Sequence, residues 1–319
     1  MTTLTVEELY LTKQKTLGLE LLTPNVSLAR DVESPTLSSP GLVLAGFRDR
    51  FLRGRLQVLG ETEVRFLLSL DEAQRHHTID TFLRLQMPAL FVTKRLDVPP
   101  ALIELASAHA VPVFRSSMKT ADFYRRLQPY LEERFAPSTS QHGSLADVYG
   151  VGLMFVGRSG IGKSECVLDL IERGHRLVAD DVVMITRRGN DVLIGRGHER
   201  QQHHMEIRGI GIVDIRALFG IRSIRQQKRI EVVVKLVDWD DNAQYDRTGL
   251  QVDEIDILGV GLPQVVIPLV AGKNITVISE VVAMNHLLKY AGVHSAELFN
   301  QRLMNSMQGV RAYLEEDYE

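Results

Sequence analysis

The spacing of apolar positions predicts alternating helices and strands in the first part of the chain. Apolar residues recur at helical spacing in three segments, Asp71 to Gln86, Ala101 to Ala110 and Ala121 to Arg134. Between them lie two short apolar runs that are typical of buried strands, Ala89 to Thr93 and Val111 to Phe114. This alternation predicts a small α/β domain.

A polar stretch without periodicity follows, Pro137-Ser138-Thr139-Ser140-Gln141, and we expect it to be a linker. The boundary near Pro137 then divides the chain into an N-terminal α/β domain, residues 1–136, and a C-terminal domain, residues 137–319. Helical patterns end the second domain, from Glu280 to Glu315. The β-rich segments before them are Leu177 to Thr186, Val192 to Gly195, Ile230 to Val237 and Val265 to Leu269.

The second domain contains a segment that matches G-x-x-x-x-G-K-S, the pattern of a phosphate-binding loop. The apolar run Val151 to Val156 precedes it as a predicted strand, and Glu165 to Arg173 follows with helical spacing. In such a loop, glycines let backbone N–H groups converge on phosphate oxygens, Lys163 can reach the terminal phosphates, and the Ser164 hydroxyl can bind Mg²⁺. We therefore expect a nucleotide to bind at Gly157, Arg158, Ser159, Gly160, Ile161, Gly162, Lys163 and Ser164.

Two adjacent carboxylates, Asp180 and Asp181, end the apolar segment that follows the loop helix. Mg²⁺ prefers oxygen ligands, and a hydroxyl nucleophile needs a carboxylate that accepts its proton during phosphoryl transfer. An acidic pair at a strand end is often merely solvated. The nearby phosphate loop favours a role in metal binding and proton transfer instead.

Composition limits the other classes of function. The chain has 319 residues, 45% of them hydrophobic, and a formal net charge of -3, so it can form two ordinary domains. Because there is no long basic block, neither nucleic acid nor an anionic membrane is an expected partner. The N-terminus lacks the basic and apolar blocks of a signal peptide, and we expect a cytoplasmic protein.

Several strings together resemble the bifunctional HPr kinase/phosphorylase family of bacteria, in order and in spacing. They cover the chain from His142 onward: His142-Gly143, Val148-Tyr149-Gly150-Val151-Gly152, Ser159 to Glu165, Arg173 to Asp181, and Met205-Glu206-Ile207-Arg208-Gly209-Ile210-Gly211. The resemblance implies an N-terminal α/β domain followed by a carboxykinase-like phosphate-loop kinase domain.

The resemblance also implies roles for single residues. Asp181 corresponds to the carboxylate that accepts the proton of the substrate serine in phosphorylation and returns it in dephosphorylation, and His142 corresponds to an active-site histidine. Glu206 matches a metal ligand that acts with Ser164. Arg247 matches a catalytic arginine that stabilises charge on the transferred group.

One segment departs from the family pattern. Where the family has Pro-x-Arg-Pro-Gly-Arg-Asn, a string associated with dephosphorylation, this chain has Pro268, Leu269, Val270, Ala271, Gly272, Lys273 and Asn274. Val270 replaces an arginine, and Lys273 keeps a positive charge without the bidentate fork of a guanidinium. We therefore expect phosphorylase activity to be weaker than kinase activity. Arg158 is a second departure, at a position where the family often has an acidic residue.

The resemblance implies an ATP-dependent protein serine kinase that phosphorylates a serine of the phosphocarrier HPr, removes the phosphate by phosphorolysis and so controls carbon metabolism. It further implies Mg²⁺ as cofactor, phosphate or pyrophosphate in the reverse reaction, and a homohexamer. One alternative is a small-molecule kinase or carboxykinase-like enzyme, since related folds act on metabolites. The other is a non-catalytic nucleotide-binding regulator, which is favoured if Asp181 and Glu206 face away from the loop.

Overall fold

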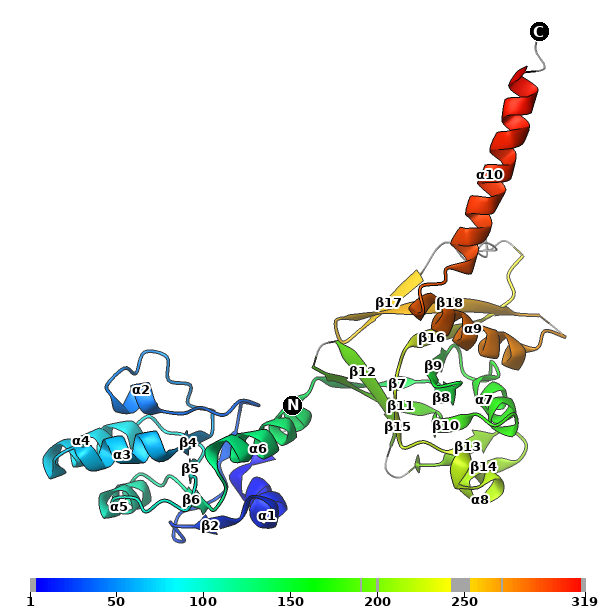
Figure 1. The fold of residues 1–319 in the computed structure, drawn as a ribbon. Helices are drawn as coiled ribbons and strands as arrows, with labels where there is room; N and C mark the ends of the chain where they lie inside the picture. Colours follow the sequence, from blue (N-terminus) through cyan, green and yellow to red (C-terminus); the bar gives the residue numbers. More distant parts are fainter. Residues whose placement is uncertain (1–3, 190, 199–200, 242–252, 271, 317–319) are drawn as a thin grey trace. The chain divides into compact units, whose positions relative to one another are not determined.

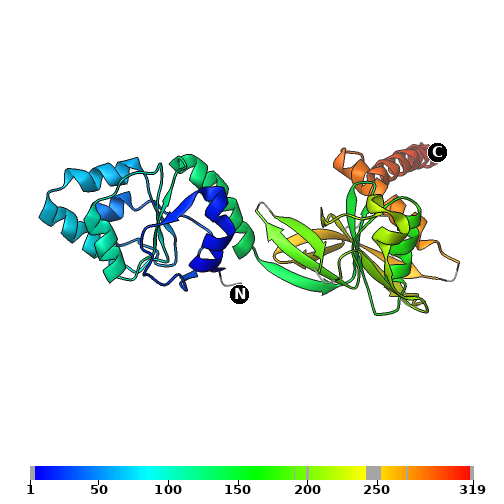
Figure 2. The ribbon, with the colours of Figure 1, turned by 90° about the horizontal axis from the view of Figure 1, so that it is seen from below.

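The computed structural model describes residues 4–189, 191–198, 201–241, 253–270 and 272–316. The chain forms two compact units, Met1–Ala136 and Pro137–Glu319, which are drawn in Figures 1 and 2. Within the described residues, no helix combines the length and apolar character needed to cross a membrane.

The N-terminal unit is a sheet with helices on both faces. Its four strands lie in the order β2-β6-β5-β4, with β4, β5 and β6 parallel and β2 antiparallel to β6. The strands are β2 (Leu19–Leu21), β4 (Gln57–Leu59), β5 (Leu90–Val92) and β6 (Val113–Ser116), and a separate pair is formed by β1 (Leu4–Thr5) and β3 (Asp31–Val32). The helices are α1 (Val6–Leu17), α2 (Gly41–Leu44), α3 (Glu61–Ser69), α4 (Glu72–Leu83), α5 (Pro100–Ala108) and α6 (Thr120–Phe135).

Alternating side chains of the strands build two cores in this unit. Phe91 and Phe114 pack on one face with apolar residues of α1 and α6, whereas Leu90 and Val92 pack on the other face with α3, α4 and α5. The five elements expected between Asp71 and Arg134 are confirmed as α4, β5, α5, β6 and α6, which makes this unit the expected α/β domain.

The C-terminal unit has two stacked sheets and a helical layer. The larger sheet has the strand order β10-β8-β9-β16-β18-β17, and the smaller one β15-β12-β11-β7. Helices α7 and α9 pack on one face of the larger sheet, and strands of the smaller sheet pack on the other. The strands of the larger sheet are β8 (Ser144–Val148), β9 (Val151–Val156), β10 (Arg176–Ala179), β16 (Val232–Asp238), β17 (Asp253–Ile257) and β18 (Val260–Leu269).

The remaining elements of the C-terminal unit complete the smaller sheet, a hairpin and the helices. The smaller sheet consists of β7 (Ser138–His142), β11 (Val182–Arg188), β12 (Val192–Gly197) and β15 (Gln227–Arg229). The hairpin is formed by β13 (His204–Ile207) and β14 (Gly211–Asp214). The helices are α7 (Lys163–Glu172), α8 (Ile215–Phe219), α9 (Ile275–Tyr290) and α10 (Ser295–Glu316), with a 3₁₀ turn, η2, at Ile221–Ser223.

One expectation about this unit is wrong. The predicted linker is β7, an edge strand that pairs antiparallel with β11 from Ser138 to His142. Its residues are exposed or half-buried, so backbone pairing holds it in place without an apolar pattern. The expected β-rich segment Leu177 to Thr186 is confirmed as two strands, β10 and β11, which belong to different sheets.

Candidate active site

The phosphate loop joins β9 to α7, and neighbouring groups approach two of its glycines closely. A Cβ on Gly157 would lie 2.6 Å from the carbonyl oxygen of Leu236, and one on Gly160 would lie 2.5 Å from Nη1 of Arg208. Both glycines also have positive φ, +151° and +75°. The expected strand, loop and helix are confirmed, with α7 beginning at Lys163.

Lys163 folds back over the loop that precedes it. Its Nζ donates hydrogen bonds to the carbonyl oxygens of Gly157 at 3.1 Å and Arg158 at 3.0 Å. The ammonium group therefore lies within the curve of the loop, at the position from which it could reach the terminal phosphates of a nucleotide.

The parallel strands bring two further segments to the edge where the loop lies. Because β9, β16 and β18 run parallel, their carboxyl ends share one edge of the larger sheet. β9 leads into Gly157 of the loop, β16 ends at Asp238, and β18 leads into Val270. Asp238 accepts two hydrogen bonds from the Arg158 guanidinium, at 2.5 and 2.8 Å.

This ion pair affects the charge of both groups. Hydrogen bonding between the two groups raises the pKa of Arg158 and lowers the pKa of Asp238. The positive charge of Arg158, the loop residue that departs from the family pattern, is therefore paired with a carboxylate at the end of β16.

The two adjacent carboxylates point in different directions. Asp180 is buried, and its Oδ1 accepts hydrogen bonds from Ser144 Oγ at 2.5 Å and Ser164 Oγ at 3.0 Å. Burial raises the pKa of Asp180, an effect that these two hydroxyl groups and the backbone N–H groups of Asp181 and Glu206 partly oppose. Asp180 is therefore hydrogen-bonded to the loop serine, and the strand that carries Glu206, β13, packs against α7.

The second oxygen of Asp180 suits a metal ligand. Asp180 Oδ2 is buried and has no hydrogen-bond partner among the described residues. No group of three or more His, Cys, Asp or Glu side chains that could enclose a metal occurs in the same residues. Mg²⁺ is usually held by one or two carboxylates together with nucleotide phosphates, so a buried carboxylate oxygen beside the Ser164 hydroxyl fits this ion.

Asp181 lies in the turn between β10 and β11, where it has a φ of +66° and an exposed side chain. Aspartate tolerates this left-handed conformation better than most residues, and such strained positions are frequent at functional sites. His142, at the end of β7, has its Nδ1 3.7 Å from Asp181 Oδ1. The structure thus brings together these two residues, which the sequence separates, on the solvent side of the buried Asp180.

The segment associated with dephosphorylation lies at the same sheet edge as the phosphate loop. Pro268 and Leu269 end β18, and Val270 is 46% exposed. Lys273 Nζ donates to the carbonyl oxygen of Pro268 at 3.1 Å, and Asn274 caps α9 by accepting from Val277 N at 3.0 Å. Arg247 and Ala271 lie outside the described residues.

A buried carboxylate links the loop helix to the helix that follows this segment. Glu280 of α9 accepts hydrogen bonds from Arg173 Nε and Nη2, at 2.9 and 2.7 Å, and forms another with His175 Nε2 at 3.0 Å. The Arg173 guanidinium is the main reason that the pKa of Glu280 falls to about 2. Glu280 therefore fixes α9 to the C-terminal end of α7 and to the start of β10.

Sequence reasoning missed three residues of the site. Asp180 was seen only as one half of an acidic pair, because its burial depends on the turn after β10. Arg208 was part of a matched string, but nothing in the string indicates that its guanidinium lies against Gly160. Asp238 directly follows an apolar strand, and that position was the only available signal.

Two family models match the chain, one to each of its two parts. The chain matches the family model described as HPr Serine kinase C-terminal domain over residues 133–303, and that described as HPr Serine kinase N terminus over residues 4–131. An HPr kinase/phosphorylase of Chloroherpeton thalassium is 46% identical over 300 residues, which cover 91% of this chain and 88% of that protein. An HPr kinase/phosphorylase of Geobacillus kaustophilus is 43% identical over 290 residues, which cover 91% of this chain and 93% of that protein.

A solved structure is also similar in sequence. The Hpr(Ser) kinase/phosphatase of Coxiella burnetii is 31% identical, with a TM-score of 0.44, and the match covers 48% of this chain and 99% of that one.

Proposed function

The chain belongs to the HPr serine kinase family, and we propose that it transfers the γ-phosphoryl group of ATP to a serine of HPr and removes it again by phosphorolysis. The observation that carries this proposal is the turn after β10. It directs the Asp180 carboxylate inward to Ser164 and leaves Asp181 exposed beside His142. A nucleotide loop and an accessible carboxylate are the two parts that phosphoryl transfer to a hydroxyl group needs.

In the forward direction, the oxygen of the substrate serine attacks the γ-phosphorus of ATP and ADP leaves. Asp181 accepts the hydroxyl proton, since an exposed carboxylate can approach a serine presented by another protein. His142, when protonated, attracts the Asp181 carboxylate or a phosphate oxygen and so helps to orient the reacting groups. Arg247 is proposed to stabilise charge on the transferred group.

In the reverse direction, an oxygen of inorganic phosphate attacks the phosphorus of phosphoserine, and pyrophosphate forms. The bond from phosphorus to the serine oxygen breaks, and Asp181 returns the proton to that oxygen. The segment Pro268 to Lys273 would take part in this direction, since it follows a strand that ends at the same sheet edge as the phosphate loop.

We propose that Ser164, Asp180 and Glu206 hold Mg²⁺. The ion would supply positive charge to the phosphate oxygens as phosphoryl transfer proceeds. Ser164 and Asp180 share a hydrogen bond of 3.0 Å, and the unpartnered Oδ2 of Asp180 provides a hard oxygen ligand. Lys163 and the glycines bind and orient the nucleotide.

Residues 137–319 are proposed as the catalytic domain and residues 1–136 as a separate α/β domain. We also propose a cytoplasmic homohexamer. Support for self-association comes from apolar side chains that α9 leaves exposed, namely Val277, Val281, Met284, Leu287 and Leu288. The mass of the assembly, measured by light scattering at several protein concentrations, tests this proposal.

The activity is tested with purified HPr, Mg²⁺ and ATP labelled in the γ-phosphate. We expect label on a serine of HPr, followed by its release as pyrophosphate when inorganic phosphate is added. Lys163→Ala should slow labelling by about a hundredfold, because a contact to the terminal phosphates is lost. Labelling of a metabolite in place of HPr would favour a small-molecule kinase, and nucleotide binding without turnover would favour a regulator.

A further inference from the structure

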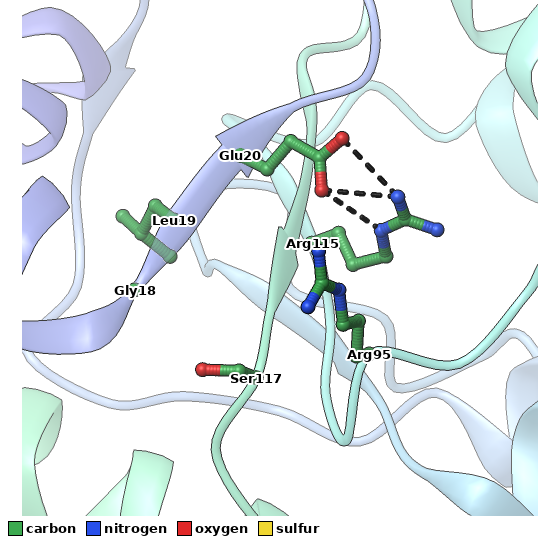
Figure 3. A pocket seen from close by; sticks show the side chains of 6 residues that line it. All are labelled: Gly18, Leu19, Glu20, Arg95, Arg115 and Ser117. Atoms are coloured by element: carbon green, nitrogen blue, oxygen red, sulfur yellow. Dashed lines mark hydrogen bonds and ion pairs between the residues drawn. The ribbon is translucent and has the colours of Figure 1, made fainter.

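The N-terminal unit has a pocket of about 240 Å³ that is remote in sequence from the phosphate loop. Figure 3 shows the residues that line it, Gly18, Leu19, Glu20, Arg95, Arg115 and Ser117. None of them has a role in the activity proposed above.

The pocket lies at the edge of the sheet where open α/β folds bind ligands. Arg95 follows β5 and Ser117 follows β6, two neighbouring parallel strands. Gly18 leads into β2, which runs antiparallel to β6 and so begins at this same edge. Ligands of open α/β sheets bind outside the carboxyl ends of the parallel strands.

The loop that carries Arg95 is held in a strained conformation. Lys94 and Arg95 both have positive φ, 58° and 51°, which is uncommon for residues with these side chains. Their backbone N–H groups donate to the carbonyl oxygens of Met118 at 2.7 Å and Ser116 at 2.8 Å. Ser116 is itself buried and donates from Oγ to Leu17 O at 2.5 Å. Strain that the surrounding contacts maintain is typical of ligand-binding segments.

Of the two arginines of the pocket, one is paired with carboxylates and the other is not. Arg115 donates two hydrogen bonds from Nη2 and one from Nε to Glu20, and a further one of 3.3 Å to Asp97. Arg95 is exposed, and no carboxylate in the described part of the chain pairs with its guanidinium. The excess positive charge of the pocket therefore comes from Arg95.

Ser117 adds a hydroxyl group on another wall. A Cβ on Gly18 would lie 2.9 Å from Ser117 Oγ, so the glycine leaves space beside this hydroxyl. A guanidinium fork and a hydroxyl from a second direction suit a tetrahedral anion, because its oxygens point out of the plane of the fork.

We propose that this pocket binds a small molecule that carries a phosphate group, with Arg95 and Ser117 as the groups that contact the phosphate. The volume of about 240 Å³ is below the range of about 300–1,000 Å³ that drug-sized ligands occupy. A single phosphate ester is therefore a better fit than a whole nucleotide. The N-terminal unit would then have a ligand site of its own, distinct from the phosphate loop.

The test measures binding of radioactive inorganic phosphate to the full chain by equilibrium dialysis. Because the phosphate loop is also proposed to bind phosphate, Arg95→Gln is compared with Lys163→Ala and with the double variant. We expect Arg95→Gln to weaken one class of sites by about tenfold or more, as expected for loss of a charged hydrogen bond. Lys163→Ala should weaken phosphate binding at the phosphate loop instead, and the double variant should lose phosphate binding at both sites.

Arg53→Gln is the matched control, since it removes an exposed arginine of the same unit that does not line the pocket. Hydrogen exchange with and without phosphate locates the site, and we expect protection of the peptides that contain Arg95 and Ser117. The proposal is overturned if Arg95→Gln binds phosphate as the parent protein does, if Lys163→Ala removes all binding, or if Arg53→Gln has the same effect as Arg95→Gln.

Discussion

The hydroxyl of Ser164 donates a hydrogen bond of 3.0 Å to Oδ1 of Asp180, which joins the first turn of α7 to the end of β10. Asp180 is buried there with its second oxygen unpartnered among the described residues. A buried carboxylate with incomplete hydrogen bonding is unfavourable for folding, and such groups are found where a ligand completes them.

Asp180→Asn should therefore lower the kinase activity without lowering the stability of the fold. Burial raises the pKa of Asp180, so its ionised form is disfavoured in the fold, and stability is lost as the pH rises through the folded-state pKa. At pH 7, without Mg²⁺, we expect the variant to melt at the same temperature as the parent protein or a few degrees higher. Kinase activity should fall by about a hundredfold. Calorimetry measures the melting temperature, and kinase rates are measured across a range of Mg²⁺ concentrations. If the variant depends on Mg²⁺ as the parent protein does, Asp180 is not a ligand of the ion.

Arg208 should contribute to phosphate binding, because its guanidinium lies against Gly160 of the loop. For Arg208→Ala we expect kcat/KM for ATP to fall by about tenfold to a hundredfold, with partial recovery in Arg208→Lys, which keeps the charge but loses the planar fork. Arg216→Ala removes an exposed arginine of α8 and serves as control. Equal rates for all variants and the parent protein would show that Arg208 merely covers the loop.

Much of this architecture could be predicted from local patterns. Apolar periodicity identified α4 to α6 and the strands between them, and the glycine spacing identified the phosphate loop with its flanking strand and helix. Each of these features is determined by residues that are close together in the sequence, so it can be predicted from the sequence alone.

The rest depends on contacts between distant segments. β7 is held by backbone pairing with β11 and needs no apolar residues, which is why it was mistaken for a linker. Likewise, Asp180 is buried whereas Asp181 has a positive φ and an exposed side chain, and Arg208 reaches Gly160 of the loop from the turn that follows β13. None of these contacts has a local sequence signature.

Glu280 should stabilise the C-terminal unit in a pH-dependent way. Its pKa falls from 4.5 to about 2, chiefly because of Arg173, so its stabilisation is present above pH 4.5 and is lost as the pH falls toward 2. We expect Glu280→Gln to reduce the free energy of unfolding by about 2 kcal/mol at pH 7. Urea unfolding between pH 7 and pH 3 checks this, since the difference from the parent protein should shrink at acid pH. A difference that is constant with pH would contradict the ionic contribution.

The segment at the end of β18 should limit the reverse reaction. Val270 is exposed at a position where the family resemblance implies an arginine, and an apolar side chain offers phosphate no hydrogen-bond donor. We expect Val270→Arg, alone and with Lys273→Arg, to raise the rate of phosphate-dependent dephosphorylation several-fold and to leave phosphorylation unchanged. The assay varies the phosphate concentration. If the parent protein already works equally fast in both directions and the substitutions change neither rate, the segment is not limiting.

The central claim is that Asp181, exposed beside His142, transfers the proton in both directions, and Asp181→Asn tests it most directly. The amide keeps the shape of the side chain but accepts no proton at neutral pH. Phosphorylation of HPr, phosphorolysis of phosphoserine-HPr and ATP affinity are measured on the same preparation. We predict that both rates fall by about a hundredfold or more while ATP affinity stays within about twofold. Loss of one direction alone, or a fall in ATP affinity that matches the fall in rate, would contradict the claim.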